Sequence, residues 1–248
     1  MNTNYEHFEG KDVVEHLAVA REKGAKATAE VHGTEMPGYL SAAADSLKET
    51  ALLLLGLWLL FSAFSVAKPL GILGIFCVGW FFWKVGRSSL LGWARLERLH
   101  RLIEQERWEI EHHRPQEKEE LTAMYRQKGL TGALLDQVIE VLMADDNRLL
   151  RVMLEEELGL TLESYEHPLK QAAGAGGGVL LAVASGTLGF FLGGTVGVVL
   201  LLTCAFGIAT ILASKWEGNE IMKSLIWNLA VGALGVGSIF LLARWIGS

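Results

Sequence analysis

The sequence has little cysteine, little proline and no block of charge of one sign. Its 248 residues include two cysteines and four prolines, and the formal net charge is −6. Cys77 and Cys204 lie inside apolar runs without a partner nearby in sequence, which argues against a disulfide framework and a cysteine-based metal site. Because the charge is evenly mixed, without a lysine or arginine cluster, we expect no nucleic-acid partner.

The sequence pattern also lacks a signal peptide and a catalytic motif. The first fifty residues are mixed and polar, so we expect internal segments to direct membrane insertion. No Ser/His/Asp, Cys/His or zinc-hydrolase arrangement is visible. Glu109 to His112 is a single Glu-x-x-His pair, whereas di-iron carboxylate bundles use two. We therefore expect that the protein is not an enzyme.

What the sequence does contain is long apolar runs. Hydrophobic residues make up 51% of the chain and are concentrated in runs instead of being spaced as in a soluble core. A membrane helix needs roughly 20 mainly apolar residues. Five runs approach that length: Ala51 to Ala67, Leu70 to Gly86, Ala172 to Gly193, Thr195 to Ser214 and Leu225 to Ala243. The predicted fold is an all-α, multi-pass membrane protein with five transmembrane helices in contact with lipid.

Turn residues and positive charges give these spans an order and a direction. Lys68-Pro69 and Gly193-Gly194 each separate two runs, which predicts two helical hairpins. A cytosolic amino terminus places 20 of the 22 lysines and arginines in the cytosol, as the positive-inside rule favours. Small residues crowd the last three spans, as in the run Gly174 to Gly178, and predict close helix packing. The short loops favour a bacterial cytoplasmic membrane over a vacuolar one.

An acidic segment interrupts the spans. Between Lys84 and Lys170 lie 17 of the 28 acidic residues, with boundary signals for four helices. The expected helices are Ser88 to His113 (continuous with the second span), Pro115 to Lys128, Gly132 to Met143 and Asp146 to Leu158. We predict a cytosolic amino-terminal segment at 1–48, a transmembrane hairpin at 49–87, a cytosolic helical domain at 88–168, inserted between spans 2 and 3, and spans 3 to 5 at 169–248.

Helical periodicity directs several acids of this domain toward its apolar faces. At 100° per residue, Glu97, Glu104 and Glu111 fall on the polar side of the first helix. Other acidic side chains fall within or beside apolar stripes: Glu106, Glu109, Glu117, Glu120 and Glu157. Met153 and His113 lie on the same faces and offer a thioether and an imidazole.

Carboxylates that converge on an apolar interface repel one another and lose hydration, at a cost of several kcal/mol per ion. A divalent cation would relieve this cost. Oxygen ligands suit Mg²⁺, Ca²⁺, Mn²⁺ and Fe²⁺, and an added thioether or imidazole favours Fe²⁺ and Zn²⁺. The residues alone leave two interpretations open, a metal site or an interface with salt bridges from Arg107, Arg114 and Arg151.

The stretch from Glu106 to Glu120, followed by Tyr125 to Leu130 and Glu156 to Gly159, resembles the vacuolar iron transporter family. That family carries two E-x-x-E pairs separated by an eight-residue step, and a later helix with two methionines and a glutamate. The positions that match are Glu106, Glu109, Glu117, Glu120, Met153 and Glu157, while Leu154 replaces the second methionine. The resemblance implies that these six residues bind metal.

The resemblance also implies a homodimer that moves Fe²⁺ or Mn²⁺ out of the cytosol in exchange for protons, and Zn²⁺ suits the same ligands. The Asp-Gly and Ser-Met motifs that line the ion path in the family's first two spans are missing. Asp45 and Glu49, at the cytosolic edge of the first span, are the candidates for that path. The alternative is a non-transporting membrane protein whose cytosolic domain binds metal as a sensor or a structural element.

The amino-terminal segment contains several further donor side chains: His7, His16, His32 and Glu35. A lone histidine is more often structural or exposed than a metal ligand, and this spacing fits no standard metal motif. The sequence therefore favours no role for them in metal binding.

Overall fold

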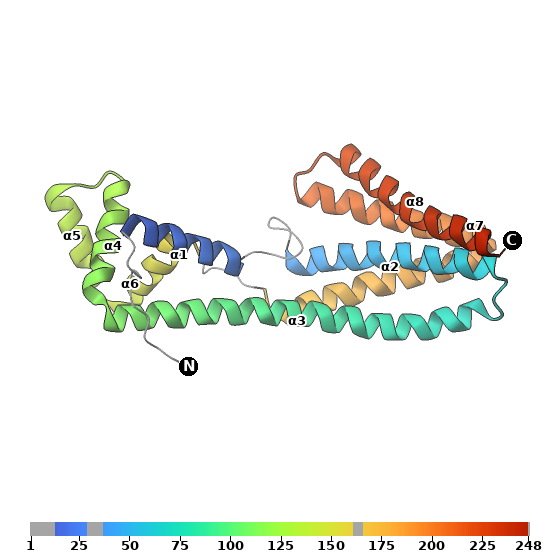
Figure 1. The fold of residues 1–248 in the computed structure, drawn as a ribbon, viewed down its shortest axis with the longest axis horizontal. Helices are drawn as coiled ribbons and strands as arrows, with labels where there is room; N and C mark the ends of the chain where they lie inside the picture. The colour runs from blue at the N-terminus through green and yellow to red at the C-terminus, as the bar shows by residue number, and fades with distance from the viewer. Residues whose placement is uncertain (1–12, 29–36, 161–165, 248) are drawn as a thin grey trace. The chain divides into compact units, whose positions relative to one another are not determined.

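The computed structural model describes residues 13–28, 37–160 and 166–247, and the regular elements in these residues are all helices (Figure 1). In chain order they are α1 (Val13–Thr28), α2 (Gly38–Ala63), α3 (Pro69–His112), α4 (Arg114–Gln127), α5 (Gly132–Met143), α6 (Asp146–Val152), the π-helical turn η1 (Met153–Glu157), α7 (Pro168–Trp216) and α8 (Ile221–Ile246). The prediction of an all-α fold is confirmed.

Packing divides these residues into two units. The first, which we call the acidic unit, contains residues 13–28 and 94–160, and the second, the membrane unit, contains residues 37–93 and 166–247. Helix α3 is continuous, as predicted, and contributes its first part to the membrane unit and residues 94–112 to the acidic unit. The acidic unit therefore combines a helix that precedes the first apolar run with helices that follow the second.

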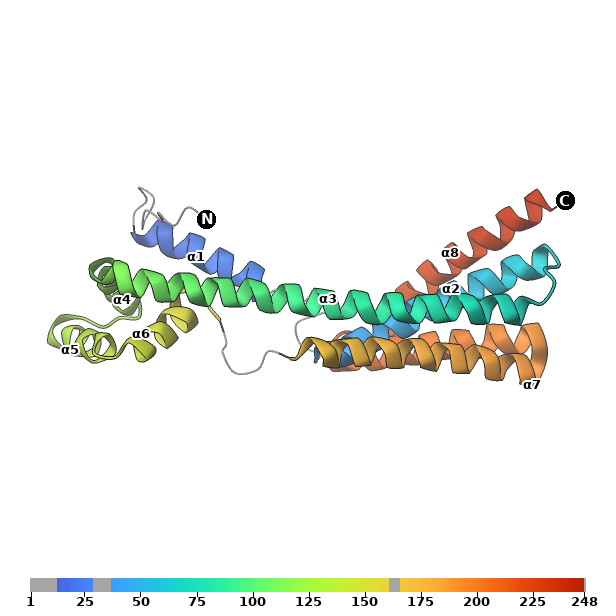
Figure 2. The same ribbon diagram turned by 90° about the horizontal axis from the view of Figure 1, so that it is seen from below.

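Four helices among the described residues are long and apolar enough to cross a membrane, namely α2, α3, α7 and α8. The sequence predicts five spans, and the difference lies in α7. Gly193 and Gly194 have non-helical backbone angles, and Gly194 has a φ of 57°. A Cβ added to Gly189 would lie 2.5 Å from the carbonyl oxygen of Gly197, although eight residues of continuous helix span about 12 Å. The chain therefore reverses at Gly193-Gly194, and α7 consists of two antiparallel arms (Figure 2).

The start of the membrane unit differs from the prediction. Helix α2 begins at Gly38 and ends at Ala63, whereas the predicted first span runs from Ala51 to Ala67. The residues after Ala63 form the turn instead, because Ser65 and Lys68 both adopt positive φ angles before Pro69 starts α3. Apolar composition does not detect this turn, because its residues include Phe64, Val66 and Ala67.

Small residues bring α2 and α7 together, as the glycine-rich run predicts. A Cβ on Gly174 would lie 2.0 Å from the backbone oxygen of Tyr39, and one on Gly178 would lie 2.1 Å from that of Ala43. Spacing of four residues places both glycines on one helix face. Helix α3 packs through larger side chains, and the indole nitrogen of its Trp80 donates a 3.0 Å hydrogen bond to the hydroxyl of Thr50.

The outer surface of the membrane unit is strongly apolar. Its exposed side chains include Ile75 (79% exposed), Phe191 (77%), Trp227 (70%) and Phe82 (69%). Large apolar side chains exposed in this number are unfavourable in water and favourable in hydrocarbon. The helices of this unit therefore match the surroundings that the sequence predicts.

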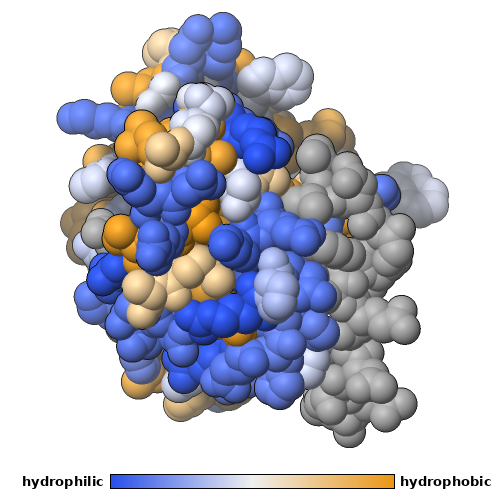
Figure 3. All heavy atoms as spheres, turned by 90° about the vertical axis from the view of Figure 1, so that its left-hand side faces the viewer, coloured by the Kyte–Doolittle hydropathy of each residue, from blue (hydrophilic) through white to orange (hydrophobic). Residues whose placement is uncertain are grey.

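The acidic unit is built around two neighbouring apolar clusters. Leu17, Ile110, Leu121 and Met153 belong to the first, with side chains from α1, α3, α4 and η1. Leu99, Leu154, Leu158, Leu160 and Ala20 form the second. The end face of this unit is mainly hydrophilic, with a few apolar patches (Figure 3). Burial of these side chains holds α1 against α4 and η1.

Candidate metal centre

Five glutamates and one methionine occupy the interior of the acidic unit. Glu106 and Glu109 come from α3, Glu117 and Glu120 from α4, and Glu157 from η1. Each of the five is at most 7% exposed, and Met153 is fully buried. By contrast, Glu97, Glu104 and Glu111 are exposed, as the helical periodicity predicts. Buried carboxyl groups are rare unless they are paired, protonated or bound to a cation.

The local sequence explains how these side chains reach the interior. Glu106 and Glu109 lie on the same helix face as Leu99 and Ile110, which are both 2% exposed. Pro115 occupies the first turn of α4, where its missing N–H group leaves no internal hydrogen bond unmade. The chain turns between α3 and α4, and this brings the glutamates of α4 toward those of α3.

The position of Glu157 depends on a π-helical turn that the sequence does not predict. The expected helix Asp146 to Leu158 is α-helical only as far as Val152. Its start agrees with the prediction, because the Asp145 side chain accepts a 2.8 Å hydrogen bond from the backbone N–H of Arg148. From Met153 the chain widens, and the backbone N–H of Leu158 donates to the carbonyl of Met153, five residues earlier. Such turns are frequent at functional sites.

Carboxylate oxygens from three elements converge. One oxygen each of Glu106, Glu117 and Glu157 lies within 4.8 Å of the other two. Within the described residues, Oε1 of Glu106 is buried and has no hydrogen-bond partner. Glu109 lies beside this group, and its Oε1 accepts a 2.9 Å hydrogen bond from the side-chain amide of Gln105.

The electrostatics of the cluster favour neutral carboxyl groups. Loss of hydration, reinforced by the negative charges of Glu106, Glu120 and Glu109, raises the pKa of Glu117 from 4.5 to about 10. Burial also raises the pKa of Glu157 well above its usual range, and the neighbouring charges of Glu120 and Glu117 add to the effect. Without a cation Glu117 holds a proton near neutral pH, and a divalent cation would replace that proton.

The arginines considered in the salt-bridge interpretation do not pair with the cluster. Arg107 and Arg151 are exposed. Arg114 donates instead to Oδ1 of Asp146 and to the carbonyl oxygen of Met143, each at 2.6 Å. Within the ranges that the structure describes, these three arginines form no ion pair with the five glutamates. The observed packing therefore removes the main argument for an interface neutralised by these arginines.

The two histidines near the cluster differ in position. His113 packs edge-on against the ring of Trp108, with 5.3 Å between the ring centroids, and lies outside the groups of described side chains whose donor atoms converge. His16 of α1 lies at the cluster, and its Nε2 is 3.8 Å from oxygens of both Glu120 and Glu157. His7, His32 and Glu35 fall outside the described residues. The sequence signal for His16 was weak because only tertiary packing brings α1 to this site.

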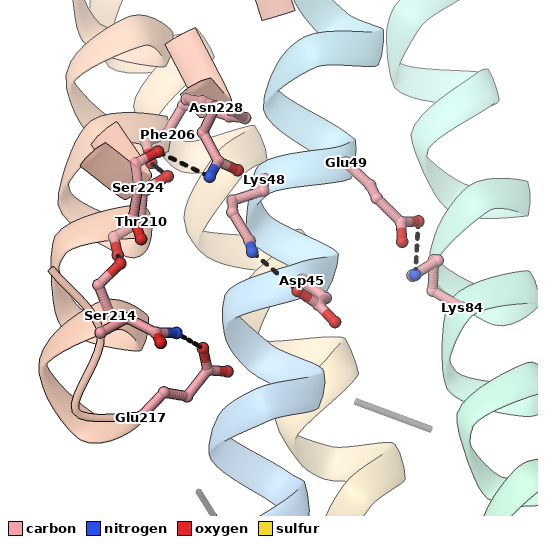
Figure 4. A network of polar contacts seen from close by, with 11 residues as sticks. Asp45, Lys48, Glu49, Lys84, Phe206, Thr210, Ser214, Glu217, Ser224 and Asn228 are labelled. Carbon is pink, nitrogen blue, oxygen red and sulfur yellow. Dashed lines mark hydrogen bonds and ion pairs between the residues drawn. The ribbon is translucent and has the colours of Figure 1, made fainter. Parts of the chain in front are cut away.

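The candidates for an ion path, Asp45 and Glu49, lie on α2 in the membrane unit and both have basic partners (Figure 4). Nζ of Lys48 lies 2.9 Å from Oδ1 of Asp45 on the same helix. Lys84 reaches across from α3, and its Nζ is 2.7 Å from Oε2 of Glu49. Asp45 and Glu49 line an open cavity of about 330 Å³ that is also lined by Asn228 of α8.

Comparison of the sequence with known protein families gave a match that covers most of the helices described above. Residues 94–244 match the VIT family. The chain belongs to the VIT family. This agrees with the resemblance to vacuolar iron transporters that the glutamate motif carries, and the membership indicates an integral membrane protein that transports a metal ion. Comparison with curated proteins and with solved structures gave no match. The VIT family match begins at Ala94, so it does not include α1 or α2.

Proposed function

We propose that this VIT family protein transports Fe²⁺ or Mn²⁺ out of the cytosol in exchange for protons, and that the acidic unit captures the ion. The observation that carries the proposal is the convergence of buried oxygens from Glu106, Glu117 and Glu157 within 4.8 Å. Like-charged carboxylates at that separation in an apolar interior need either protons or a cation. Metal binding would release protons from the same groups, which links the two ions chemically.

The ligand set supports a choice of ion. Carboxylate oxygens suit Mn²⁺ and Fe²⁺, and the thioether of Met153 adds a soft donor that suits Fe²⁺ and Zn²⁺ better than Mg²⁺ or Ca²⁺. The proposed capture ligands are Glu106, Glu109, Glu117, Glu120, Met153 and Glu157. Asp45 and Glu49 are proposed to accept the ion at the cytosolic edge of α2, while His113 remains a candidate for an extra ligand.

The proposed topology has five crossings, with both arms of α7 counted as separate spans and a cytosolic amino terminus. The packing of α1 against α4 and η1 supports the first two of these crossings independently of charge. Residues 13–28 and 94–160 belong to one unit, so the chain between them must leave and return to the same membrane face. Two crossings, by α2 and the first part of α3, satisfy that requirement. A bacterial cytoplasmic membrane is the proposed location.

A homodimer is part of the proposal. In the most apolar stretches of α8 and α3, only 6% and 11% of the residues are buried within one chain. In the corresponding stretches of α2 and α7 the share is 39%. Large faces of α8 and α3 are therefore available to a second copy as well as to lipid.

Flux measurements test the proposal. The full-length protein in proteoliposomes should carry Mn²⁺ or Fe²⁺ in the presence of a pH gradient, and the flux should fall several-fold in E117Q and E157Q. E119Q is the matched control, because Glu119 lies on the exposed face of the same helix as Glu117. Flux equal to that of empty vesicles, with metal binding intact, would contradict transport.

One observation favours the alternative of a membrane protein that binds metal without transporting it. The ammonium group of Lys84 neutralises Glu49, one of the two acids proposed for the ion path. In that case the first hairpin serves as an anchor and the acidic unit acts as a sensor or a structural element. Metal binding without flux would support this second function.

A further inference from the structure

We propose that His16 of α1 is a nitrogen ligand of the metal centre, so that a helix outside the VIT family match completes the site and determines its ion selectivity. The inference rests on the proposed function, because it concerns the same centre. It assigns a ligand that the glutamate motif does not contain.

The packing of α1 fixes the position of His16. Leu17 is 2% exposed and belongs to the cluster of Ile110, Leu121 and Met153. Ala20, 5% exposed, belongs to the cluster of Leu99 and Leu154. The buried side chains of Leu17 and Ala20 therefore fix two adjacent faces of α1. His16 lies next to Leu17 and one turn before Ala20. The imidazole is therefore held at the glutamates by buried apolar contacts.

The distances suit coordination better than direct hydrogen bonding. Nε2 of His16 lies 3.8 Å from Oε1 of Glu120 and 3.8 Å from Oε1 of Glu157, beyond the usual range of an N–H···O hydrogen bond. Two donor atoms that are each about 2.1 Å from one cation can be up to about 4.2 Å apart. The nitrogen and the two oxygens all lie within 4.8 Å of one another, so small side-chain rotations bring them into one coordination shell.

A second observation points to a cation at this place. His16 lines a cavity of about 20 Å³ together with Gln105, Glu106, Glu109 and Glu157. That volume accommodates one water-sized guest. Oε1 of Glu106, whose residue is 3% exposed, has no hydrogen-bond partner within the described residues. A buried oxygen without a partner, beside an ion-sized cavity, needs a cation or a proton.

Glu157 connects this group to the rest of the centre. It belongs both to the set of His16 and Glu120 and to the set of Glu106 and Glu117. His16 therefore adds an imidazole at one edge of the same centre. An imidazole among carboxylates favours Fe²⁺ and Zn²⁺ over Mg²⁺ and Ca²⁺, because the hard cations bind oxygen. The predicted role of His16 is to separate transition ions from the abundant hard cations.

The first test measures Zn²⁺ and Mg²⁺ binding to the full-length protein in detergent, for the wild type, H16Q and H100Q. His100 is an exposed histidine of α3 and serves as the control. We expect H16Q to weaken Zn²⁺ binding by about tenfold or more and Mg²⁺ binding by less than about twofold. Equal loss of both ions, or no loss of Zn²⁺ binding, would overturn the assignment. Wild-type protein that binds no metal would overturn the proposed function itself.

The second test reads the ligand directly and does not depend on affinity. X-ray absorption of the Zn²⁺-loaded wild type should show imidazole scattering, which should decrease in H16Q and persist in H100Q, because His100 is exposed. Wild-type spectra without imidazole would refute the role of His16 and leave a carboxylate centre intact, so the two failures are distinguishable.

Discussion

Lys84 of α3 donates a 2.7 Å hydrogen bond to Oε2 of Glu49 on α2. Lys84 is 4% exposed, whereas the side chain of Glu49 is about half exposed. The lysine therefore depends on this carboxylate for its charge compensation much more than the carboxylate depends on the lysine.

This asymmetry predicts opposite effects of two substitutions. E49Q leaves a buried ammonium group without its partner and should destabilise the membrane unit by about 1–3 kcal/mol, whereas K84M should be close to neutral. Thermal unfolding in detergent measures both, with K48M as a control, because the side chain of Lys48 is 20% exposed whereas that of Lys84 is 5% exposed. If Glu49 lies on the ion path, K84M should also raise Mn²⁺ flux, because Oε2 of Glu49 is then no longer paired with the ammonium group of Lys84. A larger loss of stability in K84M than in E49Q would contradict the argument.

The raised pKa values predict how pH acts on the metal-free acidic unit. The pKa of Glu117 is about 10 in the folded protein and near 4.5 when exposed. Between these values the folded state holds a proton that the unfolded chain releases, so the free energy of unfolding falls as pH rises. The slope is up to about 1.4 kcal/mol per pH unit for each such group. Hydrogen exchange of peptides from α4 and η1 should therefore accelerate more between pH 5 and pH 9 than intrinsic exchange does.

Substitution of Glu117 tests the same electrostatics from the other side. E117Q keeps the shape of the side chain without its charge, so the metal-free protein should become more stable at pH 8 and its pH slope should decrease. The stabilisation by Mn²⁺ that the proposed centre implies should weaken in the same variant. E119Q should change none of these quantities, since Glu119 is exposed. A metal-free E117Q protein that is less stable than the wild type at pH 8 would argue against the protonated cluster.

Glycines of α7 give a prediction about helix packing. A Cβ on Gly178 would lie 2.1 Å from the backbone oxygen of Ala43, and backbone cannot move aside as a flexible side chain can. G178A should destabilise the membrane unit by more than about 2 kcal/mol. G177A is the matched control, because a Cβ on Gly177 meets no atom within 4 Å. Equal midpoints of thermal unfolding for the two variants would refute the predicted close contact.

Periodicity predicted much of the acidic unit correctly. The burial of Leu99, Leu121 and Met153 and the inward direction of five glutamates follow from 100° per residue, because each helix buries the same face along its length. The turn at Gly193-Gly194 was also predictable, because the two adjacent glycines that mark it in the sequence are the residues whose backbone angles leave the helix.

Features that depend on long-range packing were not predictable. The π-helical turn at Met153 has no distinctive local residues, and the sequence predicted an ordinary helix there. The contact of His16 with Glu157 joins segments that are far apart in the chain, and no single segment contains a signal for it. The sequence placed the end of the first span at Ala67, whereas α2 ends at Ala63. Composition could not show this, because Phe64, Val66 and Ala67 are apolar although they belong to the turn.

The packing of α1 into the acidic unit has a consequence for biosynthesis. The ribosome makes His16 early, but Glu120 and Glu157 emerge only after two hydrophobic segments have been synthesised, on the order of ten seconds later. Until then α1 has no surface to bury Leu17 against. This helix is therefore translated first, but it cannot pack into its unit until the helices that cover Leu17 have been made.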